Sequence, residues 1–466
     1  MKDTFEVVVI GAGPTGLKAA VTLATHGVET LLVDENHQTG GQYLRRPPSG
    51  PLPLSGWMPP AKRAGLSLIE KLPSLPSLTV MSATTLLSLQ RGFTLALQSP
   101  GGLLQVKTDR LIIATGTRER LFPFPGWTLP GVMAAGGVQL LLKEGGKLPG
   151  RRTVVAGTGP FLFSAAAEIV KRGGEVVRLL EERGIASQLP FALALASLPS
   201  KTVEGFVYME DLLRKGAVPH FSERLVAAEG NGKLERVTIA KVNRRGEEIP
   251  GSRRSFETDT AAISGGFLPN TELFSILEVP LKRDPSLGGW VVPTLDDLHT
   301  SLPGLYAAGE VTGVGGAEKA LLEGELAALS LMEDLGRKDS DLTKRKEGLI
   351  RRRRGALRYS RALNTVYPFP KGLFGNLPPE TILCRCEEVS LKDVREAFEL
   401  GCDNLSFLKV FTRTGMGPCQ GRTCHPLVEE LFSLWSETQP ERPPSSRFPS
   451  KPYFPFQGKR PSDPSS

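Results

Sequence analysis

Residues 5–16, Phe-Glu-Val-Val-Val-Ile-Gly-Ala-Gly-Pro-Thr-Gly, decide the fold class of this chain. The apolar run over residues 5–10 is typical of a buried parallel strand. The glycine loop after it leads into a helical pattern over residues 17–26, and residues 30–33 form a second apolar strand. A strand, a glycine-rich loop, a helix and a strand in this order predict a dinucleotide-binding unit of an α/β fold.

The residues of this first glycine loop have separate predicted roles. Gly11 permits the tight turn, Gly13 lets the backbone approach a pyrophosphate, and Gly16 brings the helix close to the strand. The N-terminus of the helix offers unpaired N–H groups and a partial positive charge to the phosphates. Asp34, at the end of the second strand, is placed to accept the ribose hydroxyls. The predicted cofactor contacts here are Gly11, Gly13, Pro14, Thr15, Gly16, Asp34 and Glu35.

A second unit of the same kind starts with an apolar strand over residues 153–156 and has a helical pattern over residues 161–171. Leu162 stands where a third glycine is usual, and Glu181 falls 24 residues after Gly157, one later than in the first unit. The bulk of Leu162 would push the helix away from the strand. Three interpretations stay open: an NAD(P) site, a vestigial fold, or a site for another adenine nucleotide. The predicted contacts are Gly157, Gly159 and Glu181.

The five cysteines lie between residues 384 and 424, and none occurs in the first 383 residues. A secreted disulfide framework would not leave most of the chain without crosslinks, so local metal binding is the better interpretation. Paired thiolates from two loops suit a [2Fe–2S] cluster; structural zinc is the alternative, although Cys-x-Cys spacing is less usual for zinc. Cys402 is predicted to be a buried thiol outside the site, and His425 an ordinary surface residue, with tuning of the cluster as the alternative for His425. The predicted ligands are Cys384, Cys386, Cys419 and Cys424.

Three further segments resemble the two-dinucleotide-domain flavoprotein superfamily and favour FAD over NAD at the first site. Residues 40–42, Gly-Gly-Gln, stand where that superfamily lays backbone against the flavin side of the cofactor. Residues 111–116 resemble its strand returning from the FAD domain, and residues 305–310 resemble its late strand, whose acidic residue meets the ribityl chain. That residue is usually Asp and is Glu310 here. The resemblance adds these cofactor contacts: Gly41, Gln42, Thr115, Gly116, Gly309 and Glu310.

The segment that holds the cysteines resembles the ferredoxin-like domain of bacterioferritin-associated ferredoxins, with all four ligand positions matched. The whole chain resembles the large FAD subunit of dye-linked dehydrogenase complexes: opine oxidases, proline and hydroxyproline dehydrogenases, and hydrogen cyanide synthase. Residues 114–132 and 383–424 carry this resemblance most clearly. It implies two Rossmann-like dinucleotide domains, arranged as in glutathione reductase, and a small, mainly helical [2Fe–2S] domain.

The same resemblance implies a function. The chain would work beside a second flavoprotein (beta) subunit, where a small amino-acid-like amine is often oxidised. Electrons would pass from FAD to the cluster and then to an acceptor. Two rivals remain: an NAD(P)H-dependent acceptor reductase that needs no such partner, and a non-enzymatic iron–sulfur docking module. The sequence places no base or nucleophile against a substrate, so catalytic residues stay unassigned.

The length of 466 residues corresponds to about three domains at ~150 residues each. Apolar residues make up 40% and charged residues 23%, an ordinary balance for a globular protein. The predicted order is residues 1–119 for the first half of an FAD domain, 120–255 for an inserted NAD(P)-like domain, 256–335 for the second FAD half, 336–377 for a basic helical linker, 378–435 for the [2Fe–2S] domain and 436–466 for a Pro- and Ser-rich tail.

The net charge of +8 comes largely from residues 344–361, which include four consecutive arginines. We interpret this segment as a solvated helix face or linker, and a docking surface for an acidic partner subunit is the alternative. Aromatic residues are not interleaved with these charges, which argues against nucleic-acid binding. No apolar run approaches the ~18 residues of a membrane helix, and no signal-peptide core is present, so we expect a cytoplasmic protein without a transmembrane segment.

Overall fold

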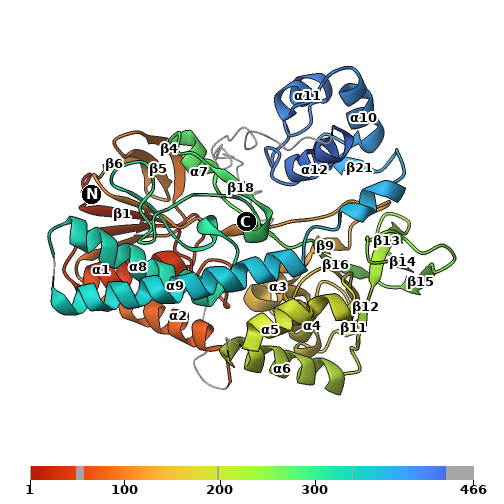
Figure 1. Ribbon diagram of the computed structural model, residues 1–466, viewed down its shortest axis with the longest axis horizontal. Helices are drawn as coiled ribbons and strands as arrows, with labels where there is room; N and C mark the ends of the chain where they lie inside the picture. Colours follow the sequence, from red (N-terminus) through yellow and green to blue (C-terminus); the bar gives the residue numbers. More distant parts are fainter. Residues whose placement is uncertain (1, 49–56, 197–198, 338, 437–466) are drawn as a thin grey trace, which may run out of the picture.

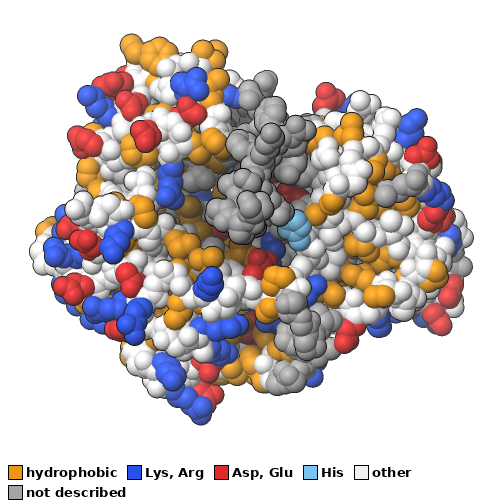
Figure 2. Space-filling model, turned by 180° about the vertical axis from the view of Figure 1, so that it is seen from behind, with side chains coloured by type: hydrophobic (Ala, Val, Ile, Leu, Met, Phe, Trp, Pro, Cys, Tyr) orange, Lys and Arg blue, Asp and Glu red, His pale blue; other side chains and the backbone are white. Residues whose placement is uncertain are grey.

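The computed structural model describes residues 2–48, 57–196, 199–337 and 339–436. In these ranges the chain forms two units with parallel sheets, a long helix that reaches from the first unit to the second, and a small helical domain at one end (Figure 1). Seen from behind, the surface is indented between the two halves of the molecule (Figure 2). The predicted fold class is confirmed. None of the helices in the described ranges combines the length and apolar character that a membrane span needs.

The first unit is built on a parallel sheet with the strand order β20-β7-β1-β2-β3. Side chains alternate along β1: Val7 and Val9 face the helices, whereas Val8 and Ile10 face a small antiparallel sheet. Because β1 lies in the middle, the glycine loop leaves from the centre of the sheet. The strands are β1 (Val7–Ile10), β2 (Thr30–Val33), β3 (Leu78–Met81), β7 (Leu111–Ile113) and β20 (Leu305–Ala307); the covering elements are α1 (Pro14–Thr25), α2 (Pro60–Lys71), α8 (Ala317–Asp334), β4 (Thr85–Gln90), β5 (Thr94–Ser99) and β6 (Gly102–Lys107).

The second unit has a parallel sheet with the strand order β12-β11-β10-β16-β9. The boundary predicted at residue 255 is too early for this unit, because β16 (Thr260–Ser264) pairs with the central strand β10 (Arg152–Gly157) and completes the sheet. The other strands are β9 (Val132–Ala134), β11 (Glu175–Glu181) and β12 (Pro219–Phe221), with the antiparallel β13 (Glu223–Glu229), β14 (Arg236–Lys241) and β15 (Arg254–Glu257); the helices are α3 (Ala135–Gly145), α4 (Phe161–Lys171), α5 (Leu189–Ala196) and α6 (Pro199–Arg214).

Two short antiparallel strands connect the units. The chain leaves the first unit through β8 (Thr117–Glu119) and returns through β17 (Phe267–Pro269). The returning segment then forms a small helix and a hairpin before β20. These elements are α7 (Glu272–Ile276), β18 (Lys282–Asp284) and β19 (Gly289–Val291), and short 3-10 turns are η1 (Leu72–Ser74), η2 (Ile185–Gln188), η3 (Pro285–Leu287), η4 (Gly309–Thr312) and η5 (Lys371–Asn376).

The long helix α9 (Ser340–Val366) is fixed to the first unit by a buried ion-pair network. Arg353 is only 6% exposed, and its Nε donates to Glu323 Oε1 of α8 at 2.9 Å. Glu323 also accepts from Lys319 at 3.1 Å, one helical turn earlier. Burial would raise the pKa of Glu323, but the two cations together lower it. The carboxylate therefore stays ionised between them.

The basic segment predicted over residues 344–361 is thus helical, but it is not wholly a solvated face. Besides the buried Arg353, Lys346 pairs with Asp297 at 3.1 Å and with Glu333 at 2.7 Å. Its cationic side chains partly neutralise acids of the same chain, which a count of charges along the sequence could not reveal.

The C-terminal domain has a short hairpin and three helices. Helix α10 (Leu391–Glu399) starts with a capping box, in which Ser390 and Asp393 bond to each other's backbone N–H groups. Trp127, which is 1% exposed, joins this domain to the second unit by donating from Nε1 to the Ile382 carbonyl at 2.7 Å. The remaining elements are β21 (Ile382–Cys384), β22 (Val389–Ser390), α11 (Leu405–Thr412) and α12 (His425–Trp435). Apart from residue 436, the predicted Pro- and Ser-rich tail lies outside the described residues.

Replacing Glu323 with Ala tests the buried network. We expect Glu323→Ala to cost about 3–5 kcal/mol of stability, because Lys319 and Arg353 would remain buried without their carboxylate. Thermal unfolding followed by circular dichroism should show a clear fall in Tm. Glu257→Ala is the matched control, since the Glu257 side chain is 79% exposed and its 3.7 Å pair with Arg152 lies on the surface. Equal Tm values for the two variants would contradict the assignment.

Candidate functional site

The loop after β1 leaves the N-terminus of α1 without a side-chain cap. Helix α1 begins at Pro14, and its N-cap is Gly13. Gly11 has φ +96°, and a Cβ there would lie 2.5 Å from the carbonyl oxygen of Ala114, so the turn requires glycine. A Cβ on Gly16 would lie 1.8 Å from the Gly11 carbonyl oxygen. The uncapped N–H groups and the helix dipole make this a suitable place for a phosphate.

Asp34 lies beside the loop and shapes it. Its Oδ2 accepts from the backbone N–H of Ala12 at 2.6 Å, and its Oδ1 accepts from the N–H of Asn36 at 2.8 Å. The side chain is almost completely buried, whereas the neighbouring Glu35 is exposed. Asn36 Nδ2 also donates to Oδ1 at 2.7 Å, so about one of the roughly four acceptor positions of this carboxylate is left for a ribose hydroxyl.

Two of the other predicted segments pack directly against the same loop. A Cβ on Gly41, which has φ +56°, would lie 2.8 Å from Gly13 Cα. A Cβ on Gly309 would lie 2.2 Å from Thr15 Oγ1. Segments that are about 300 residues apart in the chain are therefore brought to the N-terminus of α1, with glycine required at each approach.

The remaining residues predicted for the first site border this place. Asn270 holds Thr115, just after β7, by two hydrogen bonds. Asn270 Nδ2 donates to the Thr115 carbonyl at 3.0 Å, and the Thr115 hydroxyl donates to the Asn270 backbone carbonyl at 2.8 Å. Gly116 has open space where a Cβ would be, and Gln42 is exposed in a turn. Which atoms of these residues touch a cofactor stays a prediction.

Glu310 reaches the start of α8. Its Oε1 accepts from the backbone N–H groups of Gly315 at 3.1 Å and Gly316 at 3.0 Å. Burial raises the pKa of Glu310, although nearby Lys319 acts in the opposite direction. The extra methylene relative to Asp lets the carboxylate reach these glycines; the predicted contact with the ribityl chain stays untested.

An ion pair that the sequence patterns did not predict holds the Gly309 turn. Lys319 Nζ donates to the Gly309 carbonyl at 2.6 Å, and Glu323 accepts from the Gly309 N–H at 2.8 Å. Both backbone groups of this glycine are therefore fixed by one buried pair. The signal for it in the sequence is a Lys and a Glu spaced by four residues in helix α8.

The second glycine loop is closed by its own acidic residue. Glu181 is 0% exposed; its Oε2 accepts from the Gly159 N–H at 2.8 Å, and its Oε1 accepts from the Thr158 hydroxyl at 3.2 Å and the Arg183 N–H at 2.9 Å. Burial raises the pKa of Glu181 to about 7. Helix α4 also begins one residue later relative to its loop than α1 does. The carboxylate thus serves the loop itself.

Tyr367, just after α9, lies against this loop. A Cβ on Gly159 would be 3.8 Å from the Cβ and 3.9 Å from the Cγ of Tyr367. The Tyr367 hydroxyl bonds to Gln188 at 3.0 Å, and its ring packs edge-on against Phe191, with the ring centres 5.2 Å apart. The tyrosine is therefore held beside the glycine that a bound pyrophosphate would have to approach closely.

The four predicted cysteine ligands are brought together in two pairs. Cys384 contacts Cys424, and Cys386 contacts Cys419. Cys384 and Cys424 are buried, whereas Cys386 is exposed. Contact with Cys424 and backbone N–H groups, including that of Gly415, lower the pKa of Cys384 to about 6 against the opposing effect of burial. A thiolate at neutral pH is the form that binds iron.

The pairing agrees better with a two-iron cluster than with one zinc ion. In the described part of the chain, no group of three or more His, Cys, Asp or Glu side chains converges on a single metal position. Zinc needs four ligands around one ion, whereas each iron of a [2Fe–2S] cluster takes two thiolates. Cys402 is buried and lies outside both pairs, as predicted.

His425 is a correction to the sequence prediction, which placed it on the surface. Its side chain is buried, and a Cβ on Gly415 or Gly421 would lie 2.1 Å and 2.3 Å from its ring atoms. The imidazole therefore packs against two turns of the single loop between α11 and α12, which carries Cys419 and Cys424. The glycines on both sides of the last cysteines were the available signal.

Comparison with known proteins agrees with this geometry. Residues 5–324 match the family described as pyridine nucleotide-disulphide oxidoreductase. The chain belongs to that family. Residues 382–433 match the BFD-like [2Fe-2S] binding domain, which supports the assignment of the cysteine pairs. This member of the family is therefore an FAD-dependent oxidoreductase with a [2Fe–2S] domain.

Several known proteins are similar to this oxidoreductase over most of its length. An opine oxidase subunit from Agrobacterium tumefaciens is 32% identical over 449 residues, covering 93% of this chain and 86% of the relative. The HcnB subunit of hydrogen cyanide synthase from Pseudomonas aeruginosa is 31% identical over 434 residues, covering 90% of each. L-proline dehydrogenase from P. horikoshii has the same fold, with a TM-score of 0.69 at 19% identity over 96% of this chain and 77% of that one. The predicted relationship to such subunits is confirmed.

Gly13→Ala separates cofactor binding from folding in this oxidoreductase. Gly13 has φ −70°, and the only atom near a Cβ there is Gly41 Cα at 3.9 Å, so the fold can accept alanine. We expect at least a tenfold loss of FAD affinity, because the methyl group would occupy the space of the pyrophosphate. The flavin absorbance that remains with the protein after desalting measures this loss of affinity. Gly137→Ala in α3, where a Cβ meets only Ala134 at 3.9 Å, is the control and should keep its FAD.

Cysteine substitutions test the cluster ligands. Cys384→Ser should lower the iron and acid-labile sulfide of the purified protein severalfold, since one thiolate of a pair is lost. Cys402→Ser should leave both unchanged, because Cys402 lies outside the pairs. Full iron content in Cys384→Ser, or loss in Cys402→Ser, would contradict the assignment.

Proposed function

We propose that this oxidoreductase is the electron-transferring subunit of a complex that oxidises an amino acid, opine or related amine. The observation that carries the proposal is the contrast between the two glycine loops. Both loops lead into a helix without a side-chain cap, and each is bonded to its own buried acidic residue, but the second also has Tyr367 packed against Gly159. A chain with one usable dinucleotide site needs an electron donor other than a bound nicotinamide.

The names of the relatives indicate which class of compound donates the electrons. Opine oxidase and hydrogen cyanide synthase are both represented by proteins that are named as subunits. The alpha chain of sarcosine oxidase from Corynebacterium sp. (strain P-1) is also 27% identical over 332 residues, covering 68% of this chain and 31% of that relative. Opines and sarcosine are both amino-acid derivatives with a substituted amine. We therefore propose that the partner is a second flavoprotein subunit and that the substrate of the complex is small and amino-acid-like.

The residues of the chain have defined tasks in this mechanism. Gly13, Gly41 and the start of α1 would hold the FAD pyrophosphate, and Lys319 with Glu323 keeps the Gly309 turn in place beside it. Bound FAD supplies the exchange between two-electron and one-electron chemistry, and the cluster supplies a one-electron acceptor. The exposed Cys386 places one edge of the cluster site at the surface, where an external acceptor can approach.

The NAD(P)H-dependent reductase is the second candidate, and it depends on the second loop. It requires that Tyr367 leave Gly159 and that Glu181 exchange its backbone partners for ribose hydroxyls. Both changes would break hydrogen bonds inside a buried loop. Another adenine nucleotide would meet the same obstacles. The non-enzymatic docking module is disfavoured because the first dinucleotide site is complete.

An anaerobic titration distinguishes these candidates. We expect neither NADH nor NADPH, at about 1 mM, to bleach the flavin band of the purified protein within about one minute, while dithionite reduces both centres. Tyr367→Ala, which opens the space beside Gly159, is the comparison variant. Rapid bleaching of the wild-type protein by NADH would overturn the proposal in favour of the reductase.

A further inference from the structure

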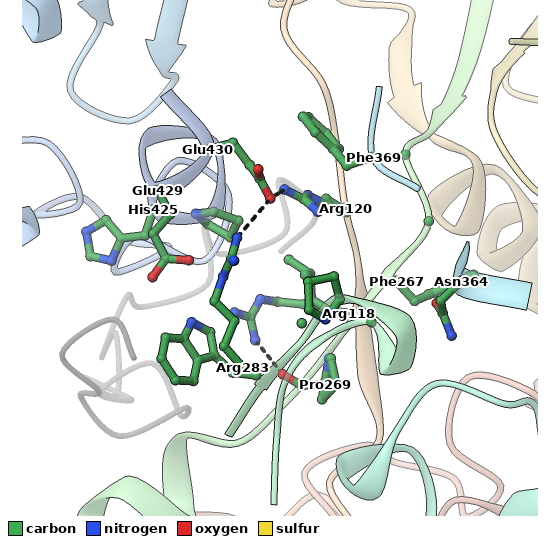
Figure 3. Close-up of a pocket in the computed structure, with 18 of the residues that line it drawn as sticks. Arg118, Arg120, Phe267, Pro269, Arg283, Asn364, Phe369, His425, Glu429 and Glu430 are labelled. Carbon is green, nitrogen blue, oxygen red and sulfur yellow. Dashed lines mark hydrogen bonds and ion pairs between the residues drawn. The ribbon is translucent and has the colours of Figure 1, made fainter. Parts of the chain in front are cut away.

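A cavity of about 650 Å³ lies where the FAD unit meets the [2Fe–2S] domain (Figure 3). Its walls come from four parts of the chain: the connecting strands β8 and β17, the β18–β19 hairpin, the end of α9 with the segment after it, and helix α12 with the turn before it. None of the residues predicted to contact FAD or iron lines it. The volume falls in the range of small-molecule sites.

Arginines line one part of this cavity. Arg120 donates to Glu430 Oε1 at 2.9 Å, and Arg283 lies 3.7 Å from the same oxygen. Arg118 pairs with Glu272 at 2.7 Å. Among the described residues, the buried Nε atoms of Arg118 and Arg120 still have no hydrogen-bond partner. Three guanidinium groups thus line the cavity, and such groups suit a planar carboxylate.

Gln420 and Glu429 line the same cavity from the other domain. The Oε1 of Glu429 and the Oε1 of Gln420 are buried, and neither has a hydrogen-bond partner within the described ranges. Burial raises the pKa of Glu429 to about 7, with Arg283 and Arg120 acting in the opposite direction. A buried carboxylate oxygen without a donor is a costly arrangement, and an ammonium group would relieve it.

These donors and acceptors together select one ligand class. A simple anion would use the arginines but would lie close to Glu429, and a simple amine would use Glu429 but would be repelled by the arginines. A ligand with a carboxylate and an ammonium group satisfies both. We propose that this cavity binds a small amino-acid zwitterion, with its carboxylate on Arg118, Arg120 and Arg283 and its ammonium on Glu429.

The cavity exists only when the two domains are docked. Arg118 and Arg120 belong to the connection after the first FAD half, whereas Gln420 and Glu429 belong to the [2Fe–2S] domain. A bound amino acid therefore links the flavin unit to the cluster domain and stabilises their contact. The ligand class agrees with the proposed amine chemistry and rests on it to that extent.

Binding without turnover tests this site. The purified holoprotein is screened by thermal shift with glycine, sarcosine and the other common amino acids, and the ligand with the largest shift is titrated by calorimetry. Its deaminated acid and its decarboxylated amine are titrated in parallel. We expect saturable binding of the amino acid, and at least tenfold weaker binding of each analogue. No binding by any amino acid, or equal binding of an analogue, would overturn the proposal.

Two substitutions locate the site. Glu429→Gln should weaken binding of the amino acid at least tenfold, so that the amino acid no longer binds more tightly than its deaminated acid. Arg283→Gln should also weaken binding of the amino acid, and this variant leaves Glu430 paired with Arg120 and Lys371. Glu257→Gln on the exposed strand β15 is the control. Retained flavin and iron absorbance shows that each variant is folded; unchanged affinity in Glu429→Gln would overturn the proposal.

Failure of this binding site and failure of the proposed function give different results. Absence of binding here, together with an inert response to NADH, would leave the electron-transferring role intact and place the amine site in the partner alone. Binding here together with rapid reduction by NADH would keep the amino-acid site and remove the proposed function.

Discussion

The ionised Glu323 is the constraint on which much of the structure depends. It holds four groups at once: Lys319 on its own helix, Arg353 on α9, the backbone N–H of Gly309 and the hydroxyl of Thr312. Two cations around one buried carboxylate remain stable because each charge has a partner within hydrogen-bonding distance. The network therefore shapes the turn beside the first dinucleotide site and anchors the long helix with the same atoms.

Helix α9 connects this ion-pair network to the rest of the molecule. It packs on α8 near Arg353, and just beyond its end Tyr367 lies against the second glycine loop. The chain then passes along the wall of the large cavity into the [2Fe–2S] domain. Trp127 and Arg120 hold that domain from the opposite side of the connection. The position of the cluster domain is thus set by these polar contacts together with an apolar core that it shares with the second unit.

The two dinucleotide-type units share a topology but differ in what their loops can do. Both have a central strand, a glycine loop and an acidic residue that bonds back to the loop. Asp34 and Glu181 are both buried, and each accepts three hydrogen bonds. The units differ in where the helix begins after the loop, by one residue, and in Tyr367, which packs against the second loop at Gly159.

Residue type and spacing along the chain were enough to predict the parallel-sheet units, the tight turn of the first glycine loop and the clustering of four cysteines, because each of these depends on a local pattern. They could not decide the boundary near residue 255, since only strand pairing shows that β16 belongs to the second sheet. They also could not place Tyr367 beside Gly159, bury His425, or join Arg118 to Glu429 around one cavity. Those features are contacts between segments far apart in the chain, and no short-range pattern encodes which side chains will meet after the domains dock.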